Sequence, residues 1–313
     1  MSIPTGISGQ IGFKVESTYG TAVTVDHFIP FVSGGIVLNI DQLEAKAIRA
    51  NRLQLDTLDS FQGRKWISGS FSTELYNRSL GPLFLCAFGA NVTAGSNPYT
   101  HTMTPGDLTG DSLTIQCGVP DTAGVVQPFT YAGCKVNQLT MEANAGELAT
   151  LNVDIIGQTV VTATSLASAS YSATLNAYTF IEGAVTVAGS SVANCEKFSL
   201  NINNGFNPRH FVGSANTSEP LQATQQVVSG TLDMEFDGLT DYNRYVNATQ
   251  AALVLTFSDG ANSIVSTMNV RYDGTTPSLD GAGIVKISQP FKALGTTDAA
   301  AITTVITNVD ATL

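Results

Sequence analysis

Residue types that commonly bind metals are sparse in this sequence and lie far apart. The four cysteines and three histidines are Cys86, Cys117, Cys134 and Cys195, and His27, His101 and His210. A structural zinc site needs closely paired cysteines or histidines nearby, and neither spacing occurs. We therefore predict no metal site, and we expect reduced thiols that pack as small hydrophobic groups.

Sequence motifs of catalysis are also missing. The chain contains no G-x-S-x-G nucleophile elbow, no H-E-x-x-H and no phosphate-binding P-loop. The segment 281–286 begins G-x-G but lacks the third glycine of a dinucleotide loop. The Asp- and Gly-rich segments 258–263 and 272–281 lack the ligand spacing of an EF-hand and are better explained as tight turns. No carboxylate pair stands out, so we predict neither an enzyme nor a cofactor.

Composition excludes further classes of protein. The 313 residues carry 25 acids against 14 bases, a net charge of −11, which argues against a protein that grips nucleic acid phosphates. The 43% hydrophobic content can fill a core and is too high for an acidic disordered chain. The longest apolar stretch, 80–90, is shorter than the roughly 20 residues that span a bilayer. The opening residues do not resemble a signal peptide, which favours a cytosolic origin and no membrane association.

The elements that carry these residues are predicted to be strands. In 67–75, apolar and small residues alternate strictly with Ser68, Ser70, Ser72 and Glu74, which is typical of a strand with one buried and one solvated face. The same alternation marks 36–40, 150–156, 197–202 and 264–270. Many short strands separated by Gly, Asn and Asp turns indicate an all-β sandwich or barrel. Short helices are expected only within 77–89 and 239–250.

An internal repeat organises the chain. The segment 67–75 (ISGSFSTEL) recurs as 228–236 (VSGTLDMEF), and 37–41 (VLNID) recurs as 199–203 (SLNIN). The two offsets, 161 and 162 residues, are close to half the chain length. Matched strands predict matched domains. We place them at 1–160 and 161–313, with the boundary in a stretch rich in small and hydroxyl residues.

Each half contains a polar connection of roughly twenty residues between its matched strands, longer than most loops in compact domains. The first, 42–63, holds Lys46, Arg49 and Arg52, and with Arg64 and Lys65 beside them this region has five of the 14 bases. A basic segment on an acidic chain suggests docking against another copy, and a solvated loop with scattered charge is the alternative. The second, 204–226, offers a different contact through Arg209, His210 and Phe211.

Five segments of the sequence resemble those of a known family. The segments concerned are 13–22 (FKVESTYGTA), 28–52, 63–90 (GRKWISGSFSTELYNRSLGPLFLCAFGA), 135–158 and 302–313 (ITTVITNVDATL). In order and spacing they are similar to the tail tube (major tail) proteins of long-tailed, non-contractile bacteriophages, in the class with two tube domains. The match covers most of the first half and the end of the chain, and the repeat supports the second half.

The resemblance implies two tandem tube-type β-sandwich or barrel domains, the first with an N-terminal arm and the second with a C-terminal strand. It implies a structural virion protein whose rings stack into a hollow tail tube that conducts the genome. Two domains per chain would make a trimer a pseudo-sixfold ring, and the long loops would contact the next ring. Expected partners are other copies, the tail tip, terminator and tape-measure proteins, and DNA that passes without specific binding. Assembly would occur in the host cytoplasm.

A tube that lets DNA slide should repel phosphates, so acids on solvated strand faces are candidates for the lumen. These are Glu74, Asp154, Asp233 and Glu235. The alternative is that they lie on the outer wall, because alternation separates wet from buried faces but does not separate inside from outside.

Two other functions fit an all-β repeat. One is a tandem β-sandwich surface or adhesion protein, which would normally carry an export signal. The other is a double β-sandwich enzyme or carbohydrate-binding module, which should show clustered aromatics or a carboxylate pair. Trp66 is the sole tryptophan and the aromatics are spread along the chain, so the tube is favoured over both.

Overall fold

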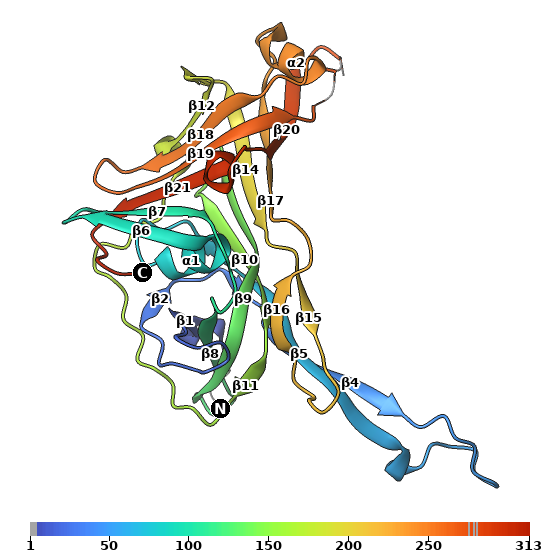
Figure 1. The fold of residues 1–313 in the computed structure, drawn as a ribbon. Helices are drawn as coiled ribbons and strands as arrows, with labels where there is room; N and C mark the ends of the chain where they lie inside the picture. The colour runs from blue at the N-terminus through green and yellow to red at the C-terminus, as the bar shows by residue number, and fades with distance from the viewer. Residues whose placement is uncertain (1–4, 275, 278, 280) are drawn as a thin grey trace.

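Antiparallel strands make up most of the molecule, which confirms the all-β prediction (Figure 1). The computed structural model describes residues 5–274, 276–277, 279 and 281–313. Its helices are α1 (Gly81–Phe88), α2 (Leu239–Val246) and α3 (Asp298–Ala301), with 3₁₀ turns η1 (Gly6–Ser8), η2 (Thr57–Asp59) and η3 (Phe180–Glu182). The first two α-helices lie in the segments predicted to be helical. The one-turn α3 was not predicted.

The longest strands form one layer, which we call the central sheet. In hydrogen-bonded order its strands are β4 (Val37–Glu44), β5 (Ser60–Glu74), β10 (Thr150–Gly157), β9 (Val126–Asn144), β14 (Cys195–Asn203), β17 (Val227–Glu235), β20 (Lys286–Ala293) and β19 (Ser263–Tyr272). The matched sequence segments lie in β4 and β14 and in β5 and β17. The order β4, β5, β10, β9 in the first half therefore corresponds to the order β14, β17, β20, β19 in the second half.

A second layer packs over one face of the central sheet. In the first half its order is β2 (His27–Ile29), β1 (Gln10–Val15), β8 (Leu113–Pro120), the beginning of β9 and β11 (Thr159–Val161). The other part of this layer contains second-half strands in the order β13 (Ser190–Ser191), β12 (Gly183–Val187), β18 (Ala251–Ser258), β19 and β21 (Ile302–Asn308), and it ends with two strands of the first half, β7 (Tyr99–Pro105) and β6 (Gly89–Gly95). The remaining strands are β3 (Ser33–Gly34), beside β5, and the hairpin of β15 (Phe206–Arg209) and β16 (Ser218–Gln222).

The two halves share both layers. In the central sheet, β14 of the second half pairs with β9 of the first half, from Lys197 opposite Asn144 to Asn203 opposite Gln138. In the other layer, the C-terminal strand β21 pairs with β7. Buried side chains of both halves form one continuous hydrophobic core. Within the described part of one chain, neither layer closes into a barrel.

The repeated Ser-Gly pairs mark close backbone contacts. Gly69 has φ +148°, and a Cβ there would collide with the carbonyl oxygen of Gly35. A Cβ on Gly230 would collide with the carbonyl oxygen of Ser199 and the ring of Phe291. Both copies therefore need glycine at this point of the strand, since any side chain would push the neighbouring strand or the core away.

Helix α1 lies inside the core rather than on the surface. Pro82 is in its first turn, where the missing N–H costs nothing, and Gly89 ends the helix in the left-handed conformation at φ +90°. Seven of its eight residues are buried, which explains why the segment is apolar all round. Its counterpart α2 has no buried residue and lies at one end of the molecule (Figure 1).

Candidate assembly surfaces

The four acids singled out from the sequence lie on the same face of the central sheet. Glu74 on β5 is opposite Thr150 on β10, and Asp154 lies four residues after Thr150 on β10. Asp233 is opposite Lys197 on one side and Ser288 on the other, and Glu235 is opposite Lys286. Directly paired residues of antiparallel strands point to the same side. This side, the polar face, is the one that carries no second layer.

Uncharged hydroxyl and amide groups dominate the rest of the polar face. Two rows cross the strands from β5 to β20, and their members are Glu74, Thr150, Glu142, Ser199, Thr231 and Pro290, and then Ser72, Asn152, Thr140, Asn201, Ser229 and Lys292. Some charges are compensated locally. Lys197 Nζ is 3.7 Å from Glu142 Oε2, and Lys286 Nζ is 2.6 Å from Glu196 Oε2. Partial burial raises the pKa of Asp154 above its ordinary value. The face is thus polar, weakly charged and on balance acidic.

The first long connection forms an arm, residues 45–59, that continues beyond the β4–β5 hairpin and projects from the body (Figure 1). Two of its three predicted contact bases are paired within the arm itself. Arg49 Nη1 is 3.0 Å from Asp56 Oδ2, and Arg49 Nη2 is 2.9 Å from Asp59 Oδ1. Arg52 also forms an ion pair with Asp56. A hydrogen bond from the Leu58 N–H and the Arg52 guanidinium hold the pKa of Asp56 below its usual value. Lys46 has no ion pair among the described residues.

Apolar side chains are the more unusual feature of the arm. Ile48 is 98% exposed and Leu53 is fully exposed, and Leu58 is 72% exposed. Leu43 and Phe61, at the base of the arm, are also more than half exposed. Several large exposed apolar groups on one projecting segment indicate a surface that another molecule covers.

The matching connection in the second half folds back onto the first half. The backbone of Lys65 accepts from Thr217 N–H and donates to Ala215 O, so the β15–β16 hairpin lies against β5. His210 packs edge-to-face on Trp66, with ring centroids 6.1 Å apart. Arg209 donates two hydrogen bonds to the Glu219 carbonyl oxygen. His210 therefore lies in an interface with the first half, and Arg209 holds the two strands of the hairpin together.

Phe211, the third residue predicted in this connection, is different. It is 59% exposed at the tip of the hairpin, with the Arg209 guanidinium 5.7 Å from its ring. The three residues are therefore together in space. Of the three, Phe211 has the surface most available for contact with another chain.

A buried lysine, which sequence reasoning missed, fixes the hairpin. Lys135 on β9 is 1% exposed, and its Nζ lies 2.6 Å from both Glu219 Oε1 and the Leu108 carbonyl oxygen. Its ammonium group is also 5.2 Å from the Phe206 ring centre. Alternation alone could not reveal this site, because a register shift between Asp154 and Ile155 of the β10–β9 pair disturbs the alternation beside it. The signal that remained was one base inside an apolar strand.

One edge of the central sheet is open. In the described chain, β4 pairs with β5 alone, whereas its counterpart β14 pairs with both β17 and β9. Apolar side chains line this edge strand, and Val37 is 51% exposed. Long unprotected edges normally invite pairing with another chain.

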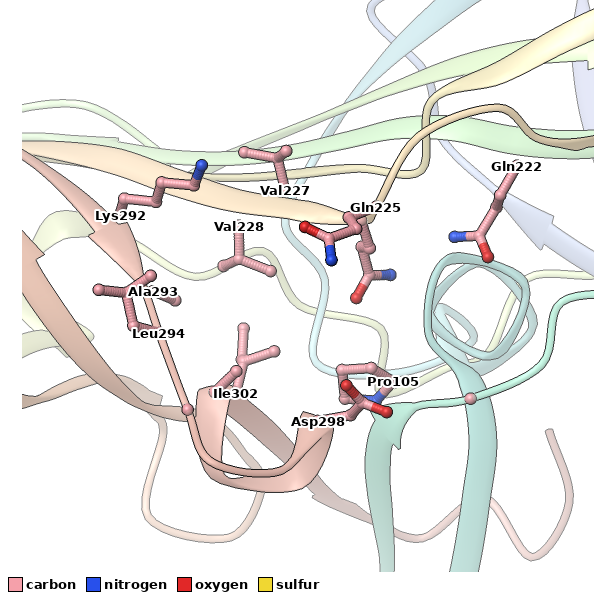
Figure 2. A pocket seen from close by; sticks show the side chains of 14 residues that line it. Pro105, Gln222, Gln225, Val227, Val228, Lys292, Ala293, Leu294, Asp298 and Ile302 are labelled. Atoms are coloured by element: carbon pink, nitrogen blue, oxygen red, sulfur yellow. The ribbon is translucent and has the colours of Figure 1, made fainter.

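A hollow of about 440 Å³ is bordered by β17, β20 and α3. The hollow in Figure 2 is lined by three glutamines together with Lys292 and Asp298, which lie at opposite sides of it. Over the described residues, no group of three or more His, Cys, Asp or Glu is arranged to hold a metal ion. The described helices include none long and apolar enough to cross a membrane. The surfaces that stand out are the open edge, the arm and the polar face.

Comparison with known proteins places the chain in a family. The model of a family described as phage tail tube protein matches residues 6–293. No match was found among curated proteins.

Proposed function

The chain belongs to the phage tail tube protein family and has a structural role in the virion tail, and from this premise we propose that copies of it close into rings that stack into a genome-conducting tube. Three steps of assembly need explanation: how copies join within a ring, which face lines the channel, and how rings join along the axis. Each step corresponds to one of the surfaces described above.

Ring closure is supported above all by the junction between β9 and β14. There, the last strand of the first four-stranded unit pairs with the first strand of the second unit. The open edge of β4 is the same edge in the first unit, and nothing in the described chain covers it. We infer that the second half of a neighbouring copy completes it, as the first half completes β14 within one chain. A head-to-tail contact of this kind generates a closed ring when the rotation per copy allows it.

The repeat also sets the proposed symmetry. We propose that residues 1–160 and 161–313 are two copies of one tube unit, so three chains supply six similar units around the axis. This arrangement gives the pseudo-sixfold trimeric ring. A tandem adhesion protein, the alternative, would be expected to keep a separate sandwich in each half. Strand pairing between the halves in both layers favours the tube.

The polar face is the proposed wall of the channel. The second layer covers the opposite face, so ring closure through the sheet edges would leave the polar face directed at the axis. Glu74, Asp154, Asp233 and Glu235 would then repel DNA phosphates, and the rows of hydroxyl and amide groups would offer no cluster of bases to hold them. The genome would pass without specific binding.

The arm is the proposed contact between rings. It continues past the end of the central sheet and exposes Ile48 and Leu53, so a neighbouring ring is the partner in reach. At the ends of the tube, the same surfaces would meet the tail tip, terminator and tape-measure proteins. Assembly would take place in the host cytoplasm, where the phage proteins are made.

The open edge gives the sharpest test of this function. Lys65 directs its N–H and C=O to the β15–β16 hairpin, away from β4. Residues at alternate positions of β5, including Ile67, therefore also direct their N–H and C=O groups away from β4. Leu38, which is opposite Ile67, therefore directs its own N–H to the open edge. Leu38→Pro should remove a hydrogen bond between copies without breaking the β4–β5 pair.

Electron microscopy of purified protein should show stacked hollow rings for wild type and mainly unassembled chains for Leu38→Pro. Leu38→Ala is the matched control, since it removes the same side chain but keeps the N–H, and it should still assemble. Circular dichroism checks that both variants are folded. Tubes from a folded Leu38→Pro variant, equal to wild type in yield, would contradict edge pairing.

A further inference from the structure

We propose that the arm of one copy binds in a groove at the junction of the two halves of a copy in the adjacent ring. This inference rests on the proposed stacked-ring assembly and names the receiving site for it. The groove, of about 400 Å³, is bordered by the β9–β10 turn, the segment from η3 to β12 and the beginning of β14. We call it the junction groove.

The junction groove and the arm lie at opposite ends of the central sheet. The arm precedes Ser60, the first residue of β5, and Glu74 is the last. Glu74 is opposite Thr150, which directly follows the β9–β10 turn that borders the groove. The fourteen steps from Ser60 to Glu74, at about 3.3 Å each, separate the two sites by roughly 45 Å along the strands. If copies join edge to edge in a ring, these two ends are the surfaces left for stacking.

The two sites match in apolar character. Phe180 and Ile181 border the groove and are 43% and 78% exposed, although a lone chain would be expected to bury such groups. Val192 and Phe198 add to the apolar lining. The arm presents Ile48 and Leu53, which have no apolar cover of their own. Burying these side chains together would stabilise the contact by the hydrophobic effect.

The charges are also complementary. Arm residues 45–59 carry three bases and two acids, and Lys46 is free of an ion pair within the described chain. Around the groove, Glu147, Glu182 and Glu196 outnumber Lys197. A basic arm and an acidic groove would orient the contact and disfavour contact between two arms.

The number of sites per chain agrees with this pairing. Each chain has one arm, because its second connection is folded back, and one β9–β14 junction. The larger hollow of Figure 2 is a poorer partner for the arm of an adjacent ring. It is bordered by Val227, the first residue of β17, whereas the junction groove lies beside the opposite end of the sheet.

Disulfide trapping in assembled tubes tests the contact directly. Leu53→Cys and Ile181→Cys are combined in one chain, in a Cys195→Ala background because Cys195 borders the same groove. Mild oxidation should link successive rings and give a ladder of covalent multimers on a non-reducing gel, since a disulfide requires Cα atoms about 4.4–6.8 Å apart. The control pairs Leu53→Cys with Val92→Cys, at an exposed position on β6, and should give no ladder.

A single substitution supplies a second test that does not depend on cysteine chemistry. Ile181→Asp should shorten or abolish tubes while rings still form, and Val92→Asp, on a side chain 68% exposed, should leave tubes unchanged. Tubes that give no ladder from the Leu53–Ile181 pair, or full-length tubes from Ile181→Asp, would overturn the groove and leave the tube function intact. Wild-type protein that never assembles would overturn both.

Discussion

The two long connections occupy the same place in the repeated unit and have opposite surroundings. The arm, residues 45–59, leaves the body with its apolar side chains exposed, and its charges pair mainly with one another. The second connection lies on the first half and is fixed by the buried pair of Lys135 and Glu219. From this difference we infer that the two loops have different roles. The second loop stabilises the chain, and the first is left for the proposed contact between chains.

The largest expected effect comes from breaking the buried pair. Lys135→Met should lower the free energy of unfolding by about 3 kcal/mol, because the Glu219 carboxylate loses its cationic partner in a mostly buried place and keeps only the hydrogen bond from the Gly110 N–H. Urea unfolding measures the loss. The double variant Lys135→Met with Glu219→Gln should recover part of it. If Lys135→Met is as stable as wild type, the hairpin is not held by this pair.

The second largest effect should be a difference between the two connections in their rate of cleavage by trypsin. Trypsin should cut the unassembled chain at Arg49 or Arg52 at least tenfold faster than at Arg209, because the arm lacks packing while Arg209 lies in a hydrogen-bonded hairpin. Mass spectrometry of a time course identifies the cuts. In assembled tubes, the sites in the arm should become protected. Equal cutting in both states would argue that the arm has no partner.

Charge reversal in the arm should affect assembly and hardly change stability. Arg49→Glu with Arg52→Glu places four acids together with Asp56 and Asp59 and removes the arm's complementarity to an acidic partner. Tubes should be shorter and fewer by electron microscopy. The free energy of unfolding should stay within about 0.5 kcal/mol of wild type, as is usual for exposed positions. A control with Arg49→Lys and Arg52→Lys should assemble normally.

The smallest effect concerns Asp154 on the polar face, which belongs to neither connection. Burial raises the pKa of Asp154, so its folded form holds a proton more tightly than its unfolded form. Stability from this residue is therefore lost as pH rises above the ordinary carboxyl pKa of about 3.9. Asp154→Asn should raise Tm slightly at pH 7 and leave it nearly unchanged at pH 3. An equal change at both values would assign the effect to packing instead of ionisation.

Much of the fold could be predicted because it depends on local patterns. Alternation in 67–75 and 150–156 placed Ile67, Phe71 and Val153 in the core, and Glu74 and Asp154 on the opposite side. The repeated Ser-Gly pair pointed to a shared strand position, and Pro82 to the start of a helix. Alternation and the repeat placed part of each of the strands β4, β5, β14 and β17, but the predicted connection 42–63 includes residues at its two ends that belong to β4 and β5.

Other features depend on contacts between segments far apart in the sequence. The pairing of β21 with β7 joins residues about two hundred positions apart, and nothing local specifies it. Arg49 and Arg52 are basic in the sequence, and only the folded arm shows that Asp56 neutralises much of that charge. The burial of Lys135 depends on the second half folding over it.

The class of the fold, the repeat and the division of each strand into an apolar and a polar side can be inferred from the amino-acid order, because side-chain alternation is a property of each strand alone. The folded chain is needed to see which polar sides join into one face, which edge stays open and which of two equivalent loops is free. These depend on strand order and register, which are set by packing between distant segments. The proposed contacts between copies involve those edges and ends, so they could be proposed only from the structure.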